Sequence, residues 1–455
     1  MKYSVDELLS ASKGSLICKK EETFQSVHFD TRNITQKGAC FFALKNQRDG
    51  HYYLNSAYAK KAHVLVVEDI SQVENLKNQI TIIQVADTSK ALLDFSKFWK
   101  DKKKFQTVAI TGSVGKTSAK HFCSILLKGQ AKVSPKSYNN KLGISLSFLQ
   151  MSDEKTLIQE VGTNQLGEVD ELCQIVKPKI SVCTEVAWSH VEGLGDIQQI
   201  AQEKEAVYRY ADIGLFNMDN KWTSQMYKNF QGSKTFTFSR KDSTCDIYLN
   251  LQKVSPQFLD VAGHILGETG KARIYVAGGH YLTSIMTAVA VAVSLEQAPG
   301  KIWKNLPLLK IFERNSGWIE LNKIKIFLDA YNANPCSMSA FLEYISIFDK
   351  ECVLLIGDML ELGYKSSFFH QELGEKVGNL PLKNVFFVGG FQSDFETGLK
   401  KSPFRGQYHL FKEYNRECGQ KIAELLNENN FLAVKASRGV QLERVVDDLK
   451  AEVCS

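Results

Sequence analysis

The sequence predicts an α/β protein with three domains, at residues 1–98, 99–312 and 313–455. A chain of 455 residues exceeds one ordinary domain, and its length is typical of about three. In the second domain, an apolar segment leads into a glycine-rich loop and then into a segment with helical spacing. In the third domain, four apolar segments alternate with helical ones, which favours a parallel sheet.

Composition and charge are those of an ordinary globular protein. Hydrophobic residues make up 44% of the chain and charged residues 23%, which allows substantial cores. The net charge of +6 is spread along the chain, so we expect no nucleic-acid binding. The ten cysteines form no Cys-x-x-Cys pair, which is typical of reduced thiols in the cytosol. No signal peptide is apparent, and the most apolar run, residues 285–295, is too short to enter a membrane as a span.

The first domain alternates short strands and helices. Residues 37–44 indicate a turn followed by a strand, and the Val-Leu-Val-Val run at 64–67 indicates a buried strand. This domain contains no nucleotide-binding loop. A substrate-docking role is open for it, but its residues alone do not require one.

The segment at 111–118 carries the clearest chemical signal. It follows the apolar run 108–110, and the backbone N–H groups of such a loop at the start of a helix bind phosphate well. Lys116 supplies a cation for the outer phosphates, and the Thr117 hydroxyl can bind magnesium. Ile110 replaces the first glycine of the usual pattern, which leaves Gly-x-x-Gly-Lys-Thr; an ordinary glycine turn is the less favoured alternative. The expected nucleotide-binding residues here are Gly112, Ser113, Val114, Gly115, Lys116, Thr117 and Ser118.

Two further strands of this domain lead to residues that can bind a metal ion. The segment 157–158 leads to Glu160, and the segment 180–183 leads towards His190. Because ligands gather at the carboxyl ends of parallel strands, we expect both residues to converge with the phosphate loop on one site. Taken singly, Glu160 reads more often as a solvated carboxylate and His190 as a surface histidine. Magnesium also prefers oxygen ligands to nitrogen.

The helical segment at 197–211 places Lys204 on its apolar stripe. Glu203 and Glu205 are expected to point to the sides of the helix. An inward-facing lysine needs a partner or loses its charge. In the alternative, only its aliphatic stem packs and the ammonium reaches water, and the sequence does not separate the two. Beyond this helix we expect an antiparallel excursion at 234–274 and a closing helix at 279–295.

The third domain has four strand candidates with helices between them, at 324–328, 353–356, 385–388 and 431–434. No Gly-x-Gly-x-x-Gly fingerprint is present, so no dinucleotide site is expected. The predicted fold is therefore a small α/β first domain, a central, mostly parallel sheet of the phosphate-loop type with helices on both faces, and a Rossmann-like third domain.

The order of these motifs resembles that of the Mur ligases of peptidoglycan synthesis. The shortened phosphate loop and the Asn-Asn-x-x-Gly segment at 139–143 match segments of those enzymes. Glu160 and His190 lie in segments similar to their magnesium-site motifs, and Lys204 stands where they carry a lysine that becomes carbamylated. In the third domain, residues 329–335 resemble the signature of the members that add D-alanyl-D-alanine. The resemblance covers all three predicted domains.

The resemblance implies an ATP-dependent, ADP-forming amide ligase. Such an enzyme joins D-alanyl-D-alanine to UDP-MurNAc-tripeptide through an acyl phosphate, in the last cytoplasmic step towards the UDP-MurNAc-pentapeptide. It implies two magnesium ions and a carbamylated Lys204, with a monomer expected. The third residue of the tripeptide, meso-diaminopimelate or lysine, stays open.

The resemblance also implies a role for each domain and site residue. The first domain would bind the UDP substrate, the second ATP, and the third the dipeptide and part of the ATP. The catalytic residues would be Lys116, Glu160, His190 and Lys204. The metal ligands would be Thr117, Glu160, His190 and Lys204. Further nucleotide contacts would come from Arg314, Asp329, Asn332 and Asn334. The UDP substrate would meet Thr31, Arg32, Asp49, His51, Asn139 and Asn140.

Some positions depart from the family pattern. Tyr281 and Ser284 stand where the family carries asparagines that often touch adenine, and Glu185 stands in place of an asparagine near the metal motif. Three alternatives therefore remain: a sister ligase with another amino component, such as a folylpolyglutamate synthetase, a nucleotide-binding protein without catalysis, and a phosphoryl-transferring kinase.

Overall fold

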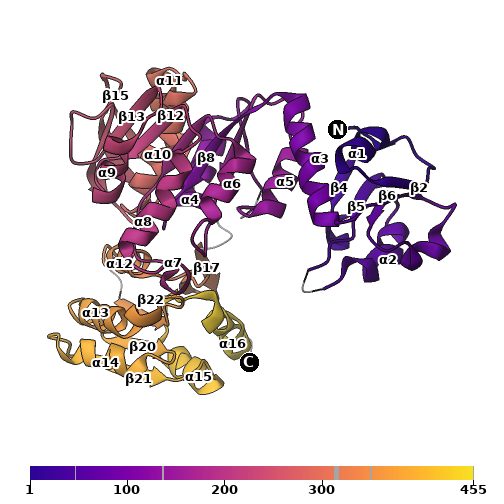
Figure 1. Ribbon diagram of the computed structural model, residues 1–455. Helices are drawn as coiled ribbons and strands as arrows, with labels where there is room; N and C mark the ends of the chain where they lie inside the picture. The colour runs from indigo at the N-terminus through magenta and orange to yellow at the C-terminus, as the bar shows by residue number, and fades with distance from the viewer. Residues whose placement is uncertain (47, 136–137, 312–316, 349–350, 454–455) are drawn as a thin grey trace. The chain divides into compact units, whose positions relative to one another are not determined.

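A computed structural model describes residues 1–46, 48–135, 138–311, 317–348 and 351–453 (Figure 1). The chain separates into two compact units. Unit 1 comprises residues 1–109, 127–162 and 171–179, and unit 2 comprises residues 110–126, 163–170 and 180–455. The predicted start of the third domain, at residue 313, lies outside the described residues.

Unit 1 begins with a five-stranded sheet whose order is β2-β7-β6-β5-β4. Strands β4 to β7 run parallel and β2 is antiparallel to β7. Side chains of β6 alternate between two cores. Val64 and Val66 pack with helices α1 and α3, whereas Leu65 and Val67 pack with α2 and the turn η3. The bounds are α1 Val5–Ser12, β2 Ser15–Cys18, β4 Ser26–His28, β5 Ala39–Phe42, α2 Leu54–Ala59, β6 Ala62–Val67, η3 Ile70–Leu76, β7 Thr81–Gln84 and α3 Thr88–Lys103. The predicted strands at 37–44 and 64–67 are confirmed.

Unit 1 also contains β9, β10 and residues 106–109 of β8, whose last residues, 110 and 111, belong to unit 2. Here β8, β10 and β9 are neighbours in that order, and β10 runs parallel to β9. Strand β10 is buried along its whole length and ends at Glu160. The bounds are β8 Gln106–Thr111, β9 Lys132–Val133, α5 Lys141–Leu149 and β10 Thr156–Glu160.

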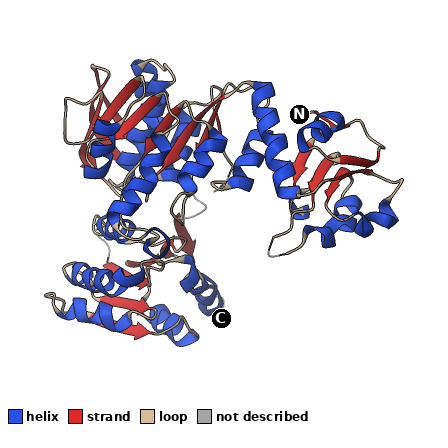
Figure 2. Cartoon of the chain, in the orientation of Figure 1, coloured by secondary structure: helices blue, strands red, loops and turns tan. Residues whose placement is uncertain are grey.

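Unit 2 contains a run of six neighbouring strands in the order β16-β15-β14-β13-β12-β11. Strands β11 to β14 run parallel to one another, whereas β15 runs antiparallel to both of its neighbours, β14 and β16. The expectation of an antiparallel excursion beginning at residue 234 was therefore wrong for β13, whose buried Phe236 and Phe238 extend the parallel sheet. Figure 2 shows helices on both sides of these strands. The bounds are β11 Ile180–Cys183, β12 Ile213–Asn217, β13 Lys234–Ser239, β14 Ile247–Val254, β15 Leu259–Ile265 and β16 Glu268–Ile274.

Two helices bring the phosphate loop into the core of unit 2. Helix α4 (Lys116–Leu126) starts directly after the loop, and α10 (Tyr281–Ser294) packs against it and against β12, β13 and β14. Nearly every residue of α10 is buried, because apolar side chains occupy all of its faces. The predicted closing helix at 279–295 is confirmed.

The second sheet of unit 2 has six strands in the order β17-β18-β22-β19-β20-β21. All neighbouring pairs run parallel except β17 and β18. Helices α12, α13 and α14 cover one face and α15 and α16 the other, so the Rossmann-like prediction is confirmed. The edge strands β17 and β21 were not predicted, because they are only half-buried and lack a continuous apolar run. The bounds are β17 Gly317–Leu321, β18 Ile324–Asp329, α12 Pro335–Ile345, β19 Glu351–Gly357, α13 Ser366–Gly378, β20 Asn384–Val388, α14 Gln392–Lys400, β21 Gln407–Phe411, α15 Arg416–Leu425, β22 Asn430–Lys435 and α16 Arg444–Val453.

Within the described ranges, no helix combines the length and the apolar character that a bilayer span requires.

Candidate active site

The phosphate loop connects the end of β8 at Thr111 to the start of α4 at Lys116. Gly112 has φ +144° and Gly115 has φ +82°, in a region that side chains other than glycine disfavour. A Cβ atom at Gly112 would overlap the Oγ1 atom of Thr184, and one at Gly115 would lie 2.8 Å from the Oγ atom of Ser284. Backbone conformation and lack of space therefore both require glycine at these two positions.

Hydrogen bonds from the segment after β11 hold this loop. The Ser113 amide donates to the Glu185 carbonyl at 2.8 Å, and the Ser113 hydroxyl donates to the Ala187 carbonyl at 2.7 Å. The Thr184 hydroxyl donates to the Val114 carbonyl at 2.5 Å. Lys116 reaches back across the loop, and its Nζ atom donates to the Gly112 carbonyl at 2.6 Å. These contacts hold the loop in the conformation that phosphate binding needs.

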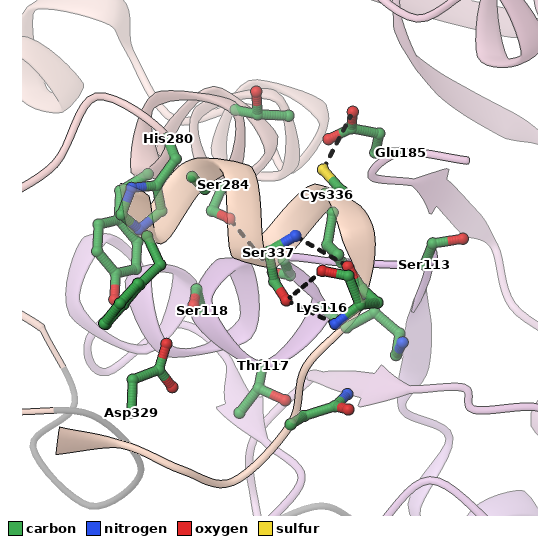
Figure 3. A pocket seen from close by; sticks show the side chains of 18 of the residues that line it. Ser113, Lys116, Thr117, Ser118, Glu185, His280, Ser284, Asp329, Cys336 and Ser337 are labelled. Carbon is green, nitrogen blue, oxygen red and sulfur yellow. Dashed lines mark hydrogen bonds between the residues drawn. The ribbon is translucent and has the colours of Figure 1, made fainter. Parts of the chain in front are cut away.

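The loop lines a cavity of about 320 Å³ (Figure 3). This volume suits a small-molecule ligand. Most predicted nucleotide-binding residues of both parts of the chain lie around it: Ser113, Val114, Gly115, Lys116, Thr117, Ser118, Asp329, Asn332 and Asn334. Gly112 instead contributes the carbonyl that Lys116 contacts. Arg314 lies outside the described residues.

Aromatic rings line the cavity away from the loop. In the view of Figure 3, His280 lies towards one end of the cavity, whereas Ser113 and Lys116 lie towards the other. The rings of His280 and Tyr281 are 4.2 Å apart, and Phe327, Phe341 and Tyr344 complete this part of the wall. Burial lowers the pKa of His280 to about 4, so its imidazole is neutral near pH 7. The rings in this part of the wall are therefore uncharged near pH 7, and a flat ring could stack on them.

Ser284 contacts the phosphate loop, which the sequence alone did not indicate. Its hydroxyl donates to the carbonyl of Gly115 at 3.3 Å, so α10 supports the phosphate loop through this side chain. Glu185, which also departs from the family pattern, lines the cavity as well. Burial raises the pKa of Glu185, and the Sγ atom of Cys336 lies 4.0 Å from its Oε1 atom.

Lys435 is a cavity residue to which the sequence reasoning gave no role. It is 2% exposed, and its Nζ atom donates to Asp329 Oδ2 at 2.7 Å and to the Asn332 carbonyl at 2.9 Å. Asp329 and Lys435 are register partners at the carboxyl ends of the parallel strands β18 and β22. A lysine directly after the apolar run Phe431–Val434 was the available signal, since parallel strands place such neighbours together.

Asn334 has a structural contact beside its predicted nucleotide role. Its Oδ1 atom accepts a hydrogen bond from the Ser337 amide at 2.9 Å, and the Ser337 hydroxyl accepts one from the Asn334 amide at 3.0 Å. This reciprocal pair caps the start of α12. The first turn of α12 is thereby fixed at the wall of the cavity.

Lys204 faces the interior of unit 2. Helix α8 (Ile197–Glu205) starts with a capping box formed by Asp196 and Gln199, and Lys204 in its last turn is 1% exposed. Burial, and to a lesser degree the positive charge of Lys116, lower the pKa of Lys204 to about 7. A substantial share of this amine is therefore neutral and nucleophilic near pH 7. The alternative in which the ammonium reaches water is excluded.

Glu203 does not point to the side of α8 as expected. Its side chain is buried, and its carboxylate accepts hydrogen bonds from the amides of Gly167 at 2.6 Å and Val169 at 2.7 Å. The hydroxyl of Thr163 donates to it at 3.2 Å. The carboxylate turns inward because it satisfies backbone N–H groups of the 163–169 loop, a demand that helical periodicity does not reveal.

His190 precedes the short helix α7 (Val191–Leu194) and has φ +52°. Its Nδ1 atom lies 2.6 Å from Oε2 of Glu361. Burial is the largest influence on the pKa of His190 and lowers it, Glu361 opposes this, and the cations Lys116 and Lys204 lower the pKa further. The neutral imidazole can then offer its second nitrogen to a metal ion.

The remaining predicted residues lie in unit 1. Glu160 is 2% exposed at the end of β10. Asn140 caps α5 by accepting from the Gly143 amide at 2.9 Å. The Asn139 carbonyl accepts from the Gly162 amide at 3.1 Å. The predicted convergence of Glu160 with the loop and His190 stays a prediction, because these residues belong to different units.

Two groups of predicted UDP-substrate residues differ in how much of their polar surface is available. His51 is buried, contacts Asp49 Oδ1 through Nδ1 at 2.6 Å and accepts from the Glu68 amide through Nε2 at 3.0 Å. Asp49 and His51 therefore stabilise their own turn. Arg32 instead exposes 87% of its side chain and pairs with Asp30 at 2.7 Å, next to Thr31.

Across the described ranges, no group of three or more His, Cys, Asp or Glu side chains is arranged to hold a metal ion. The predicted ligand set contains only two residues of those types, Glu160 and His190. Its other protein oxygens would come from the Thr117 hydroxyl and a carbamate on Lys204. Hard oxygen donors of this kind, together with substrate phosphates, suit magnesium.

Replacing Gly112 by alanine should disable the phosphate loop. We expect at least a tenfold loss of affinity for an ATP analogue and a lower melting temperature, because the new methyl group overlaps Thr184 Oγ1 and forces a strained φ, at a combined cost of about 2–4 kcal/mol. Calorimetric titration and thermal unfolding measure both effects. The matched control is Gly129→Ala, which has φ +80° but no atom within 4 Å of the new methyl group. Equal losses in the two variants would contradict this account.

Lys435→Met should lower the melting temperature because it leaves Asp329 beside an apolar group. A buried pair that loses one partner costs about 3–5 kcal/mol, and the partial exposure of Asp329 reduces that figure here. Adding Asp329→Asn should restore part of the loss. The control is Lys383→Met, which removes an exposed lysine paired with Glu351 at 2.8 Å. If Lys383→Met destabilised the protein as much as Lys435→Met, the buried pair would have no special role.

Similarity to known proteins extends along nearly the whole chain. A model of the Mur ligase middle domain matches residues 110–292. The chain is 29% identical, over 465 aligned positions and 98% of both chains, to the UDP-N-acetylmuramoyl-tripeptide–D-alanyl-D-alanine ligase of Buchnera aphidicola subsp. Baizongia pistaciae. It is 28% identical to the ligase of the same name from Rickettsia prowazekii, with 92% of this chain and 94% of that one covered. Its fold matches a crystal structure of MurF from Acinetobacter baumannii with a TM-score of 0.85, 23% identity and 99% of each chain covered.

This similarity spans nearly the full length of the named relatives. It includes the phosphate loop, the buried Lys204 and the second sheet of unit 2, where residues at strand ends line the cavity. The chain contains a Mur ligase middle domain at residues 110–292, and nearly its whole length is similar to Mur ligases in sequence or fold.

Proposed function

We propose that the chain is an ATP-dependent ligase that joins D-alanyl-D-alanine to UDP-MurNAc-tripeptide and forms ADP and phosphate. The observation that carries this proposal is the single cavity lined by both the phosphate loop and the Asp329–Asn334 segment. The phosphate loop supplies an ATP site, and the second segment supplies the feature that resembles D-alanyl-D-alanine-adding enzymes. The names of the Buchnera and Rickettsia relatives give the same two substrates. The product would be the cytoplasmic UDP-MurNAc-pentapeptide.

Each predicted domain takes one part of this reaction. Residues 1–98 would bind the UDP moiety, with the exposed guanidinium of Arg32 as the group best suited to a diphosphate. Thr31, Asn139 and Asn140 would add polar contacts, whereas Asp49 and His51 would hold the turn that shapes the surface. Residues 99–312 would bind ATP, and residues 313–455 would bind the dipeptide and complete the ATP site.

The uncharged aromatic wall gives adenine a place in the cavity. Neutral His280 and the ring of Tyr281 would contact the base, while the triphosphate extends to the loop at the other end. Ring stacking would then replace the asparagine contacts that the family often uses. Tyr281 would thus contact adenine, whereas Ser284 contacts the phosphate loop.

The reaction would proceed in two steps. The terminal carboxylate of the tripeptide attacks the γ-phosphorus, the bond to the bridging oxygen breaks, and an acyl phosphate and ADP form. The neutral amine of the dipeptide then attacks the acyl carbon, a tetrahedral intermediate forms, and phosphate leaves as the amine loses a proton. Lys116 would neutralise charge on the transferring phosphoryl group, and the loop amides would hold the phosphates in line.

Thr117, Glu160, His190 and a carbamate on Lys204 would hold magnesium. Bound there, magnesium would supply positive charge to the phosphate oxygens. Lys204 fits the carbamate because its buried amine is partly neutral near pH 7. Its nitrogen would attack carbon dioxide, form an N–C bond and release a proton, so that an anion replaces a cation in the interior.

The test is phosphate release with ATP, magnesium, UDP-MurNAc-tripeptide and D-alanyl-D-alanine, with each component omitted in turn. We expect release only in the complete mixture, and hydroxylamine should trap the acyl phosphate as a hydroxamate when the dipeptide is absent. Lys116→Ala should abolish release and leave binding of the UDP substrate intact. Release that needs no dipeptide and gives no hydroxamate would favour a kinase, and full activity with another amino component would favour a sister ligase.

A further inference from the structure

The loop after β19 brings a carboxylate to the predicted metal-binding histidine. Glu361 of this loop contacts Nδ1 of His190 through Oε2 at 2.6 Å. The backbone takes part as well, because the Glu192 amide donates to the Glu361 carbonyl at 3.4 Å. Two sequence-distant segments of unit 2, one after β11 and one after β19, therefore meet at the imidazole.

The loop that carries Glu361 is held by hydrogen bonds at the residues directly before it. The Met359 amide donates to Nε2 of His370 at 3.0 Å, and the Leu360 amide donates to the Ser437 hydroxyl at 2.9 Å. The Ser437 amide in turn donates to the Asp358 carbonyl at 3.1 Å. Side chains from α13 and from the segment after β22 thus anchor the backbone directly before Glu361.

Both partners have an unfavourable backbone conformation. Glu361 has φ +64° and His190 has φ +52°, although neither is glycine. Such a residue costs on the order of 1 kcal/mol and persists where the surroundings hold it in place. In both cases the conformation directs a side chain to the shared contact, which indicates that this contact has a use beyond stability. An ion pair as exposed as Glu361 contributes little to stability by itself.

The contact decides which nitrogen of the imidazole remains available. When Nδ1–H donates to the carboxylate, Nε2 carries the lone pair and its direction is set. A carboxylate behind a histidine ligand has this effect in metal sites generally, and its loss weakens metal binding about 10- to 100-fold.

We propose that Glu361 is a positioning residue that holds His190 in the Nδ1-protonated form and aims its Nε2 atom at the magnesium site. The inference rests on the proposed function only in taking His190 as a magnesium ligand. Since Glu361 belongs to the second sheet of unit 2, it also makes magnesium binding depend on the loop after β19. Ser437→Ala, which removes the acceptor of the Leu360 amide, should therefore weaken magnesium binding in the same direction but less than loss of Glu361.

The experiment uses the full chain and a non-hydrolysable ATP analogue, without UDP substrate or dipeptide. The first readout is the magnesium concentration that gives half-maximal analogue binding. We expect Glu361→Gln to raise this concentration at least tenfold and Glu361→Asp to raise it less. The double variant Glu361→Gln/His190→Ala should need only slightly more magnesium than His190→Ala alone. The matched control is Glu372→Gln, which removes a half-exposed carboxylate paired with Lys376 at 2.9 Å. This variant should leave the required magnesium concentration unchanged.

The second readout is the tautomer of His190 by ¹⁵N NMR of histidine-labelled protein. We expect an Nδ1-protonated ring in the parent chain and a mixture of tautomers in Glu361→Gln. An unchanged magnesium requirement, additive effects in the double variant, or an unchanged tautomer would overturn the inference, as would a His190→Ala variant with normal magnesium dependence. A failed ligase assay would instead refute the proposed function, because analogue binding needs neither the UDP substrate nor the dipeptide.

Discussion

The burial of Lys204 is the constraint on which the chemistry of unit 2 depends. A lysine with 1% exposure loses hydration, and the nearby cation Lys116 makes its own charge still less favourable, so its pKa falls to about 7. Glu203, the adjacent carboxylate, is committed to the amides of Gly167 and Val169. Conversion of the amine into an anion would relieve the repulsion by Lys116 and supply an oxygen ligand beside the phosphate loop. The positive charge of Lys116, which disfavours an ammonium at this position, would attract a carbamate anion.

The architecture was largely predictable from the sequence because buried parallel strands are continuous apolar runs. Strands β6, β11, β18, β19, β20 and β22 fall where such runs occur. The edge strands β17 and β21 were not predicted, since only part of each is buried. The parallel pairing of β13 with β12 was not predicted either, because periodicity does not indicate which strands pair. The glycines of the loop were predicted from their pattern, but the side chains that exclude a Cβ atom there, Thr184 and Ser284, come from distant segments.

The site was predictable in its residue types and less so in their contacts. Ser113–Ser118 and Asp329, Asn332 and Asn334 do line one cavity. The roles of Lys435 and Glu361 were missed because each depends on a partner far along the chain, Asp329 and His190. Asn140 also caps a helix, a use of asparagine that a motif does not distinguish from ligand binding. Pairings between distant elements are set by sheet order, which a single sequence does not specify.

The most direct test of the account is detection of the carbamate itself by ¹³C NMR, with the protein incubated in ¹³C-bicarbonate near pH 8 with magnesium and nucleotide. If Lys204 is carbamylated, one protein-bound carbamate signal should appear and should disappear in Lys204→Gln. It should persist in Lys100→Met, which removes another lysine whose pKa burial lowers, to about 8. Absence of the signal from the parent chain, or its persistence in Lys204→Gln, would contradict the central role of Lys204.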